Sequence, residues 1–146
     1  MPLNPVALQS ALESLFADPP STAAGCAQGW ADAVGSYAAG LLPTSTTIPA
    51  AKAALAAALQ SAFESSSAGS SVDDAFATFA ATVAAGMLPL FTGAPPTTPL
   101  GIVATLSGAR ETHADAAAVF AALIDGWLKT GKATLVAPPN TLVQWT

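Results

Sequence analysis

The side chains that could perform chemistry are few in this sequence, and their surroundings favour structural roles. The chain contains one histidine, His113, and one cysteine, Cys26. No serine or cysteine accompanies His113 in a catalytic pattern, so we interpret it as a first-turn residue of a helix capped by Thr112. Cys26 lies near the expected start of another helix, where a thiol can be activated, but a small buried side chain is the better interpretation.

The acidic side chains also fit roles at helix ends and on helix surfaces. Asp73 and Asp74 are adjacent in the sequence, and neighbouring residues on a helix do not face each other, so they do not predict a metal site or an acid–base pair. Both suit the first turn of a helix, and we interpret them as part of a cap that begins at Ser71. Asp125 and Lys129 have the i,i+4 spacing of a helical ion pair, worth about 0.2–0.5 kcal/mol.

Motifs that bind cofactors or metals are missing from the sequence. No glycine-rich turn is followed by Lys-Ser or Lys-Thr, and there is neither a His-Glu-x-x-His sequence nor a nucleophile elbow. One cysteine together with one histidine cannot form a zinc site, and a single cysteine cannot form an internal disulfide. We therefore expect a protein that is not an enzyme and that holds no cofactor and no metal.

The composition indicates one folded domain and excludes a nucleic-acid partner. The chain has 146 residues, of which 52% are hydrophobic and only 9% are charged, compared with roughly a quarter in a typical soluble domain. So many apolar residues exclude a charged disordered chain. Four Lys and Arg residues and a net charge of −5 provide no basic patch for a run of phosphates.

A membrane-spanning helix is not expected, although the mean hydropathy is +0.52. The best candidate segment, residues 75–91, is about 17 residues long and contains a glycine and a proline, whereas a spanning helix needs roughly 20 mainly apolar residues. The N-terminal residues lack the basic and continuous apolar regions of a secretory signal. We therefore expect the chain to begin here and to be made in the cytoplasm.

Helical periodicity of apolar residues predicts an all-α fold with about five helices. Asn4 and Pro5 form a cap and a first helical position, and Ser21 is expected to cap the second helix. Trp30 and Trp127 lie on apolar stripes and are expected in the core. The chain is predicted to form a single helical domain over residues 1–131, which consists of hairpins 4–43 and 48–89 and a last helix at 112–130.

An internal repeat supports two duplicated hairpins. Residues 8–14 recur as residues 59–65 with six of the seven positions identical, and residues 38–43 match residues 84–89. Duplicated hairpins of this kind are expected to pack as a four-helix bundle, with the last helix covering an open face.

Two segments do not follow the helical pattern. The prolines and glycines of residues 89–111 predict a long connection, in which residues 102–106 favour β structure but are too few to predict a strand. Residues 132–146 are apolar and extended in character, and we expect them to form an interaction tail that is unpaired within the chain. The residues of this tail predicted to bind a partner are Leu135, Val136, Leu142, Val143 and Trp145.

The alanine-rich, charge-poor hairpin repeat, the helix end at residues 84–89 and the proline-flanked apolar tail at residues 137–145 resemble small structural proteins of tailed bacteriophages and related contractile particles. The resemblance extends over the whole chain in composition and pattern, and it assigns no role to an individual residue. It implies a building block of the virion neck, tail or baseplate that is present in several copies.

The shortage of charge favours the same function. A surface of alanine, serine, threonine, glycine and proline is mildly apolar and suits extensive permanent contacts. We therefore expect a non-enzymatic structural subunit whose partners are other protein subunits in multiple copies, located in a virion or otherwise in the cytoplasm. Two alternatives stay open: a helical carrier of an apolar ligand, and a membrane-associated helical protein, which the acidic charge disfavours.

Overall fold

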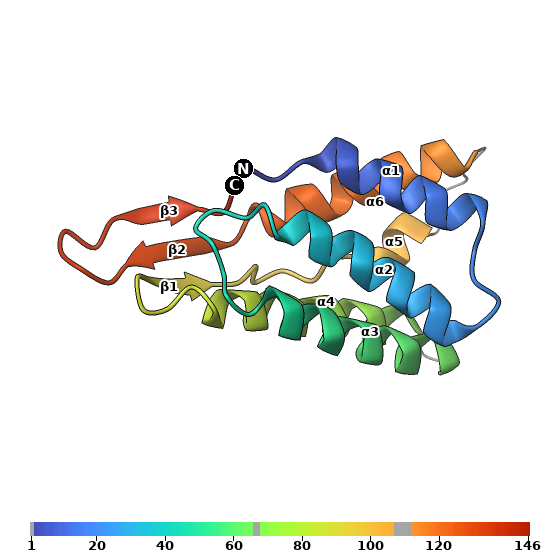
Figure 1. The fold of residues 1–146 in the computed structure, drawn as a ribbon, viewed down its shortest axis with the longest axis horizontal. Helices are drawn as coiled ribbons and strands as arrows, with labels where there is room; N and C mark the ends of the chain where they lie inside the picture. The colour runs from blue at the N-terminus through green and yellow to red at the C-terminus, as the bar shows by residue number, and fades with distance from the viewer. Residues whose placement is uncertain (1, 66–67, 107–111) are drawn as a thin grey trace.

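The computed structural model describes residues 2–65, 68–106 and 112–146 and is predominantly helical, with a small antiparallel sheet at one end (Figure 1). In chain order, the elements are α1 (Pro5–Ala17), α2 (Ala23–Ala38), α3 (Ile48–Glu64), α4 (Ala68–Ala85), β1 (Phe91–Ala94), α5 (Ile102–Leu106), α6 (His113–Leu128), β2 (Lys132–Leu135) and β3 (Leu142–Gln144).

Local capping interactions set the start of two helices where the sequence predicts them. The Asn4 side chain accepts a hydrogen bond from the backbone N–H of Ala7 at 3.2 Å, at the start of α1. The Thr112 hydroxyl accepts one from the N–H of Asp115 at 3.1 Å, at the start of α6. Each bond satisfies an N–H that has no partner within the helix, which confirms both predicted caps.

Two other helix starts differ from the prediction. Thr22, rather than Ser21, accepts the N–H of Gly25 and caps α2. Helix α4 already begins at Ala68, so the cap predicted at Ser71 is wrong. Asp73 and Asp74 therefore lie beyond the first turn of α4, and Asp73 binds a group outside its own helix.

The carboxylate of Asp73 caps a different helix. Its Oδ1 accepts the backbone N–H of Ile102, the first residue of α5, at 3.1 Å. The segment 102–106, whose residue types favour β structure, is therefore a short helix held against α4. A charged acceptor at a helix N-terminus is favourable, because the N–H groups there carry partial positive charge.

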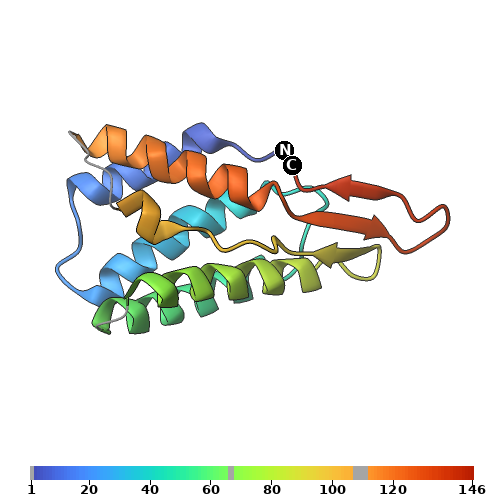
Figure 2. The ribbon, with the colours of Figure 1, turned by 180° about the vertical axis from the view of Figure 1, so that it is seen from behind.

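The last helix takes a larger part in the packing than the predicted four-helix bundle gave it. Helix α3 lies between α2 and α4, whereas α1 contacts α6 more extensively than its hairpin partner α2. Opposite views of the ribbon show α6 beside α1 along most of its length (Figures 1 and 2). The last helix is thus a principal layer of the bundle.

The two helix ends at residues 38–43 and 84–89 share several backbone features, although α2 ends at Ala38 and α4 one position later in its segment, at Ala85. Gly40 and Gly86 each donate the backbone N–H to the carbonyl three residues earlier, at 3.1 Å in both cases. The residue after each glycine is buried, the next is exposed, and each segment ends in a cis Leu–Pro bond. This part of the repeat is a structural repeat.

The other repeated segment keeps its sequence but not its environment. Leu8 in α1 and its counterpart Leu59 in α3 are both buried. Leu12 is also buried, whereas its counterpart Phe63 is 36% exposed. The difference arises because Leu12 faces the interior of the bundle, while Phe63 lies at the end of α3.

One continuous apolar core joins the helices to the sheet. Alanines such as Ala27, Ala31 and Ala51 are buried where helices meet, and small side chains permit close helix approach. Trp127 is buried as predicted, whereas Trp30 is only partly buried at the edge of this core. No helix in the described part of the chain is both long and apolar enough to cross a membrane.

The expectation of an unpaired C-terminal tail is wrong. Strands β1, β2 and β3 form an antiparallel sheet in that order, so the tail pairs with itself and with a strand from the 89–111 connection. Gly93 permits this arrangement, because a Cβ at its position would meet the backbone of Ala84 in α4. The part of the connection at residues 107–111 lies outside the described residues.

Candidate interaction surface

The three-stranded sheet projects from one end of the helical bundle. Strands β2 and β3 and the turn between them extend beyond the helices, and β1 follows α4 after the turn at residues 86–90 (Figures 1 and 2). The register pairs Phe91 with Leu135 and Ala133 with Val143. Because side chains alternate along a strand, these four residues share one face of the sheet.

The two faces of the sheet differ in burial. The face with Phe91, Ala133 and Val143, called here the inner face, is buried or partly buried. The opposite face, called the outer face, carries Thr92 and Thr134 as a directly opposed pair and is more exposed. A half-buried antiparallel sheet is expected to present polar residues on its exposed face.

Three large aliphatic side chains interrupt this polar face. Leu90, Val136 and Leu142 are 68%, 51% and 59% exposed, and we call them the outer row. The N–H of Val136 donates to the carbonyl of Leu90 at 3.0 Å, which continues the β1–β2 register by one pair. Leu142 pairs with Thr134, so it lies diagonally across from Val136, about 7–8 Å away in such a ladder.

Two further exposed leucines lie at the same end of the molecule. Leu88 lies two residues before Leu90, and Leu42 exchanges two backbone hydrogen bonds with Thr146, at 2.9 and 3.1 Å. Of the eight exposed large hydrophobic side chains among the described residues, five are therefore at the sheet end. We call the outer row together with Leu42 and Leu88 the apolar end surface.

A groove of about 410 Å³ lies at this end, between the sheet and the loop that follows α2. Its lining includes Leu42, Pro43, Met87, Phe91 and Val143. The loop is held to the sheet by the two backbone bonds between Leu42 and Thr146. Apolar side chains of the sheet, Leu90, Phe91 and Val143, thus share this groove with Leu42.

The structure separates the five residues that the sequence predicts as partner-binding. Val136 and Leu142 are exposed on the outer face, whereas Leu135 and Val143 are partly buried on the inner face. Trp145 is 0% exposed, so its predicted contact with a partner is wrong.

The burial of Trp145 follows from strand alternation. The side chains of Val143 and Trp145 lie on the inner side, and those of Leu142 and Gln144 on the outer side. The backbone N–H of Trp145 donates to the carbonyl of Gly131 at 3.0 Å, and its indole ring lies where a Cβ at that glycine would be. The indole Nε1–H has no partner among the described residues.

Sequence reasoning missed Leu42, Leu88 and Leu90, which belong to helix ends and the segment after α4. The sequence gives no signal for Leu90 as an exposed strand residue, because Leu90 and Phe91 are both apolar and the segment is too short to show an alternating pattern. The exposure of Leu90 became evident only when its partner strand was known.

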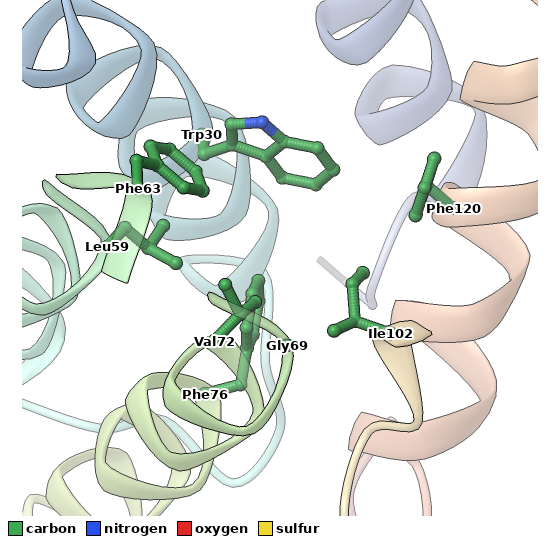
Figure 3. A pocket seen from close by; sticks show the side chains of 8 residues that line it. All are labelled: Trp30, Leu59, Phe63, Gly69, Val72, Phe76, Ile102 and Phe120. Carbon is green, nitrogen blue, oxygen red and sulfur yellow. The ribbon is translucent and has the colours of Figure 1, made fainter. Parts of the chain in front are cut away.

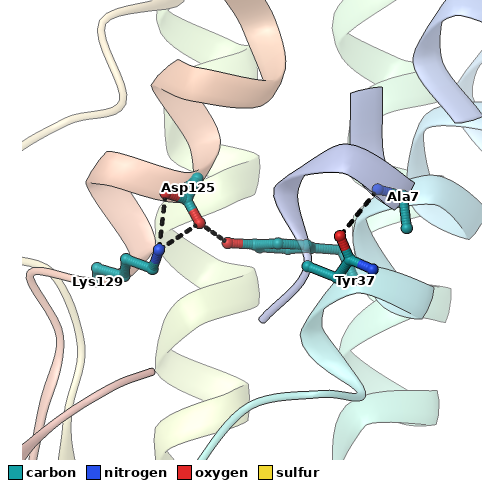
Figure 4. Close-up of polar contacts among 5 residues, drawn as sticks. Ala7, Tyr37, Asp125 and Lys129 are labelled. Atoms are coloured by element: carbon teal, nitrogen blue, oxygen red, sulfur yellow. Dashed lines mark hydrogen bonds and ion pairs between the residues drawn. The ribbon is translucent and has the colours of Figure 1, made fainter. Parts of the chain in front are cut away.

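A polar contact holds α6 against α2 (Figure 4). Strand β2 follows α6 in the chain. The Tyr37 hydroxyl donates to Asp125 Oδ1 at 2.5 Å, and Lys129 Nζ lies 2.9 Å from the same carboxylate. The ion pair predicted between Asp125 and Lys129 is therefore confirmed. Burial, and then the hydrogen bond to Asp125, raise the pKa of Tyr37 far above its ordinary value. The tyrosine is neutral at physiological pH and acts as a structural link.

The other ionisable residues are dispersed. His113 is exposed at the start of α6, and the partly buried Cys26 donates its thiol to the carbonyl of Pro20 at 3.3 Å. Lys52 bridges to Asp32 across α2 and α3 at 2.8 Å, and its hydrogen bond lowers the pKa of that carboxyl. Within the described ranges, no three His, Cys, Asp or Glu residues lie close enough to hold a metal ion.

Comparisons of the chain with protein-family models, with curated proteins and with solved structures gave no match.

Proposed function

We propose that this protein is a non-enzymatic structural subunit of a protein assembly, in which copies of the chain contact each other through the apolar end surface. The observation that carries this proposal is the outer row. Its three aliphatic side chains lie next to each other on a sheet face where polar residues are expected. A phage-type virion component is the assembly that the composition and repeat pattern favour.

The energetics of burial support a contact at this position. Full burial of an exposed leucine or valine contributes about 1.5–3 kcal/mol, and association costs on the order of 4–15 kcal/mol. In a contact between two copies each copy contributes its own side chains, so burial of the outer row with Leu42 and Leu88 contributes a free energy of the same order as this cost. The exposed Lys132 and Gln144 then provide the polar rim that surrounds the apolar centre of an interface.

The edge of the sheet offers a second mode of contact with the same surface. Strand β3 is a terminal strand, with β2 on one side. In an antiparallel strand, the backbone N–H and C=O groups of successive residues point to opposite sides. The backbone N–H of Trp145 points toward β2, whereas the backbone groups of Thr146 point the other way and bond to Leu42. The backbone groups of Leu142 and Gln144 therefore point to the edge away from β2, where an added strand can pair.

These contacts also revise the role of the C-terminal residues. The segment 132–146 contributes as a folded hairpin, through Val136 and Leu142, and not as a free arm. A rigid hairpin loses less conformational entropy on association than a flexible tail.

The experiment compares two substitutions of the same kind at different places. Val136→Glu places a charge at the centre of the outer row, and Val119→Glu places one on an exposed part of α6. Size-exclusion chromatography with light scattering, over a series of micromolar concentrations, is expected to show oligomers for the wild type and Val119→Glu and monomers for Val136→Glu. A wild-type protein that stays monomeric throughout contradicts the proposal.

A further inference from the structure

A second apolar site lies at the opposite end of the bundle from the sheet. It is a cavity of about 260 Å³ where the end of α3 and the start of α4 meet α2, α5 and α6 (Figure 3). Leu59, Phe63 and Trp30 lie on one side of this space, and Ile102 and Phe120 lie on the other.

The walls of the cavity are apolar. Its lining includes the side chains of Trp30, Phe63, Val72, Phe76, Ile102 and Phe120. None of these carries a charge, and the only polar side-chain atom among them is the indole nitrogen of Trp30. A carboxylate or an ammonium group inside the cavity would lose its hydration without compensation. The chemistry of the walls therefore selects hydrocarbon.

The cavity has a buried floor and an accessible mouth. Val72, Phe76, Ile102 and Phe120 are buried, whereas Phe63 is 36% exposed and Trp30 is partly buried. The exposed side is therefore formed by two aromatic side chains. A polar group attached to a ligand at this side is expected to stay in water.

Ring contacts fix three of the aromatic side chains that line the cavity, Trp30, Phe76 and Phe120. Trp30 and Phe120 meet with centroids 5.5 Å apart at 89°, and Phe16 contacts both, at 5.5 and 5.9 Å. Phe76 packs edge-on against Trp127, with centroids 6.2 Å apart. Rings fixed by contacts with each other favour a preformed site, which reduces the cost of binding.

We infer that this cavity binds the hydrocarbon part of a small apolar ligand. An apolar cavity of about 150 Å³ stays dry and holds benzene or xenon. The larger cavity here fits a substituted benzene or the end of an alkyl chain. These are two sources of the same chemistry: a free hydrocarbon, or an amphiphile whose head group remains at Phe63. The inference does not depend on the proposed function, because the site and the apolar end surface share no residue.

Binding is tested with p-xylene as the free hydrocarbon and decanoate as the amphiphile, each titrated into the ¹⁵N-labelled full chain. The three tryptophan indole N–H signals serve as reporters. The signal of Trp30 is expected to shift in a saturable way, while that of Trp145, at the sheet end, stays constant. A shift with p-xylene alone indicates a free hydrocarbon, and a shift with decanoate indicates an alkyl chain. No shift of Trp30 with either probe, or an equal shift of all three signals, overturns the inference.

Two variants that fill the cavity from different walls locate the bound probe. Val72→Phe and Ile102→Phe add volume from α4 and α5, and each is expected to weaken binding at least tenfold. Val136→Phe, the same kind of change at the sheet end, is the control and is expected to bind as the wild type does. Circular dichroism verifies that each variant is folded, and one folded filling variant is enough to complete the test. If a folded filling variant binds as tightly as the wild type, the probe lies elsewhere and the inference fails.

Discussion

Val136 and Leu90 lie directly opposite each other, one residue beyond the paired ends of β2 and β1, and are joined by a backbone hydrogen bond of 3.0 Å; both side chains are exposed. Leu90 follows a helix, whereas Val136 lies in the C-terminal hairpin. Neither residue forms an apolar surface alone. Their pairing, with Leu142 across the next strand, produces the outer row, and it leads to the following predictions.

Replacing the aliphatic residues of the outer row with threonine is expected to reduce self-association without loss of stability. Val136→Thr and Leu142→Thr keep a residue type that strands accept, and an exposed position contributes little to folding. The free energy of unfolding is expected to change by less than about 0.5 kcal/mol. Sedimentation velocity over a concentration series measures the association. If the variant that carries both substitutions self-associates as strongly as the wild type, the contact lies on another surface.

Trp145→Ala is expected to destabilise the protein by about 3–5 kcal/mol, because a fully buried indole is replaced by a cavity. Urea unfolding followed by circular dichroism measures the change. Leu142→Ala, in the same C-terminal segment but exposed, is the matched control and is expected to have a much smaller effect. Equal effects of the two substitutions are incompatible with a docked C-terminus.

Two glycine-to-alanine substitutions near the end of α6 are expected to have opposite signs. A Cβ at Gly131 meets the indole ring of Trp145, so Gly131→Ala is expected to destabilise the fold by about 1–3 kcal/mol. A Cβ at Gly126 meets nothing within 4 Å, and alanine favours a helix interior by about 0.5–1 kcal/mol. Gly126→Ala is therefore expected to raise the thermal midpoint. A rise for both variants would show that Trp145 does not pack on Gly131.

The stability of the protein is expected to fall above pH 10 because of Tyr37. The pKa of this tyrosine is raised in the folded state above its ordinary value of 10.0, so the unfolded chain releases the proton first. The contribution of Tyr37 is complete below pH 10 and is lost progressively as the pH rises above that value.

Tyr37→Phe provides the control for this pH dependence, since the chain has no other tyrosine. The free energy of unfolding of the variant is expected to be about 1.5–3 kcal/mol lower at neutral pH, because the hydrogen bond to the Asp125 carboxylate is lost. Its unfolding free energy is expected to fall less steeply above pH 10. In the wild type, absorbance at 295 nm is expected to show tyrosinate only when the protein unfolds. Ionisation near pH 10 in the folded protein contradicts a buried Tyr37.

The features predicted correctly from the sequence are those that depend on residues within one or two helical turns. Asn4 and Thr112 cap their helices because the N–H groups that they accept lie three residues away. Asp125 and Lys129 meet because four residues separate neighbours on a helix face. Such contacts depend little on the rest of the chain, so the predominantly helical fold was evident from local pattern.

The tertiary structure decided the strands and the surfaces that they create. A strand has no hydrogen-bonded partner within itself, so the sequence around Leu90 did not reveal that Val136 pairs with it. The register then decided which side chains face outward, and it placed Leu142 in solvent and Trp145 in the core. Asp73 likewise caps α5 rather than its own helix because the fold brings a distant N–H to its carboxylate.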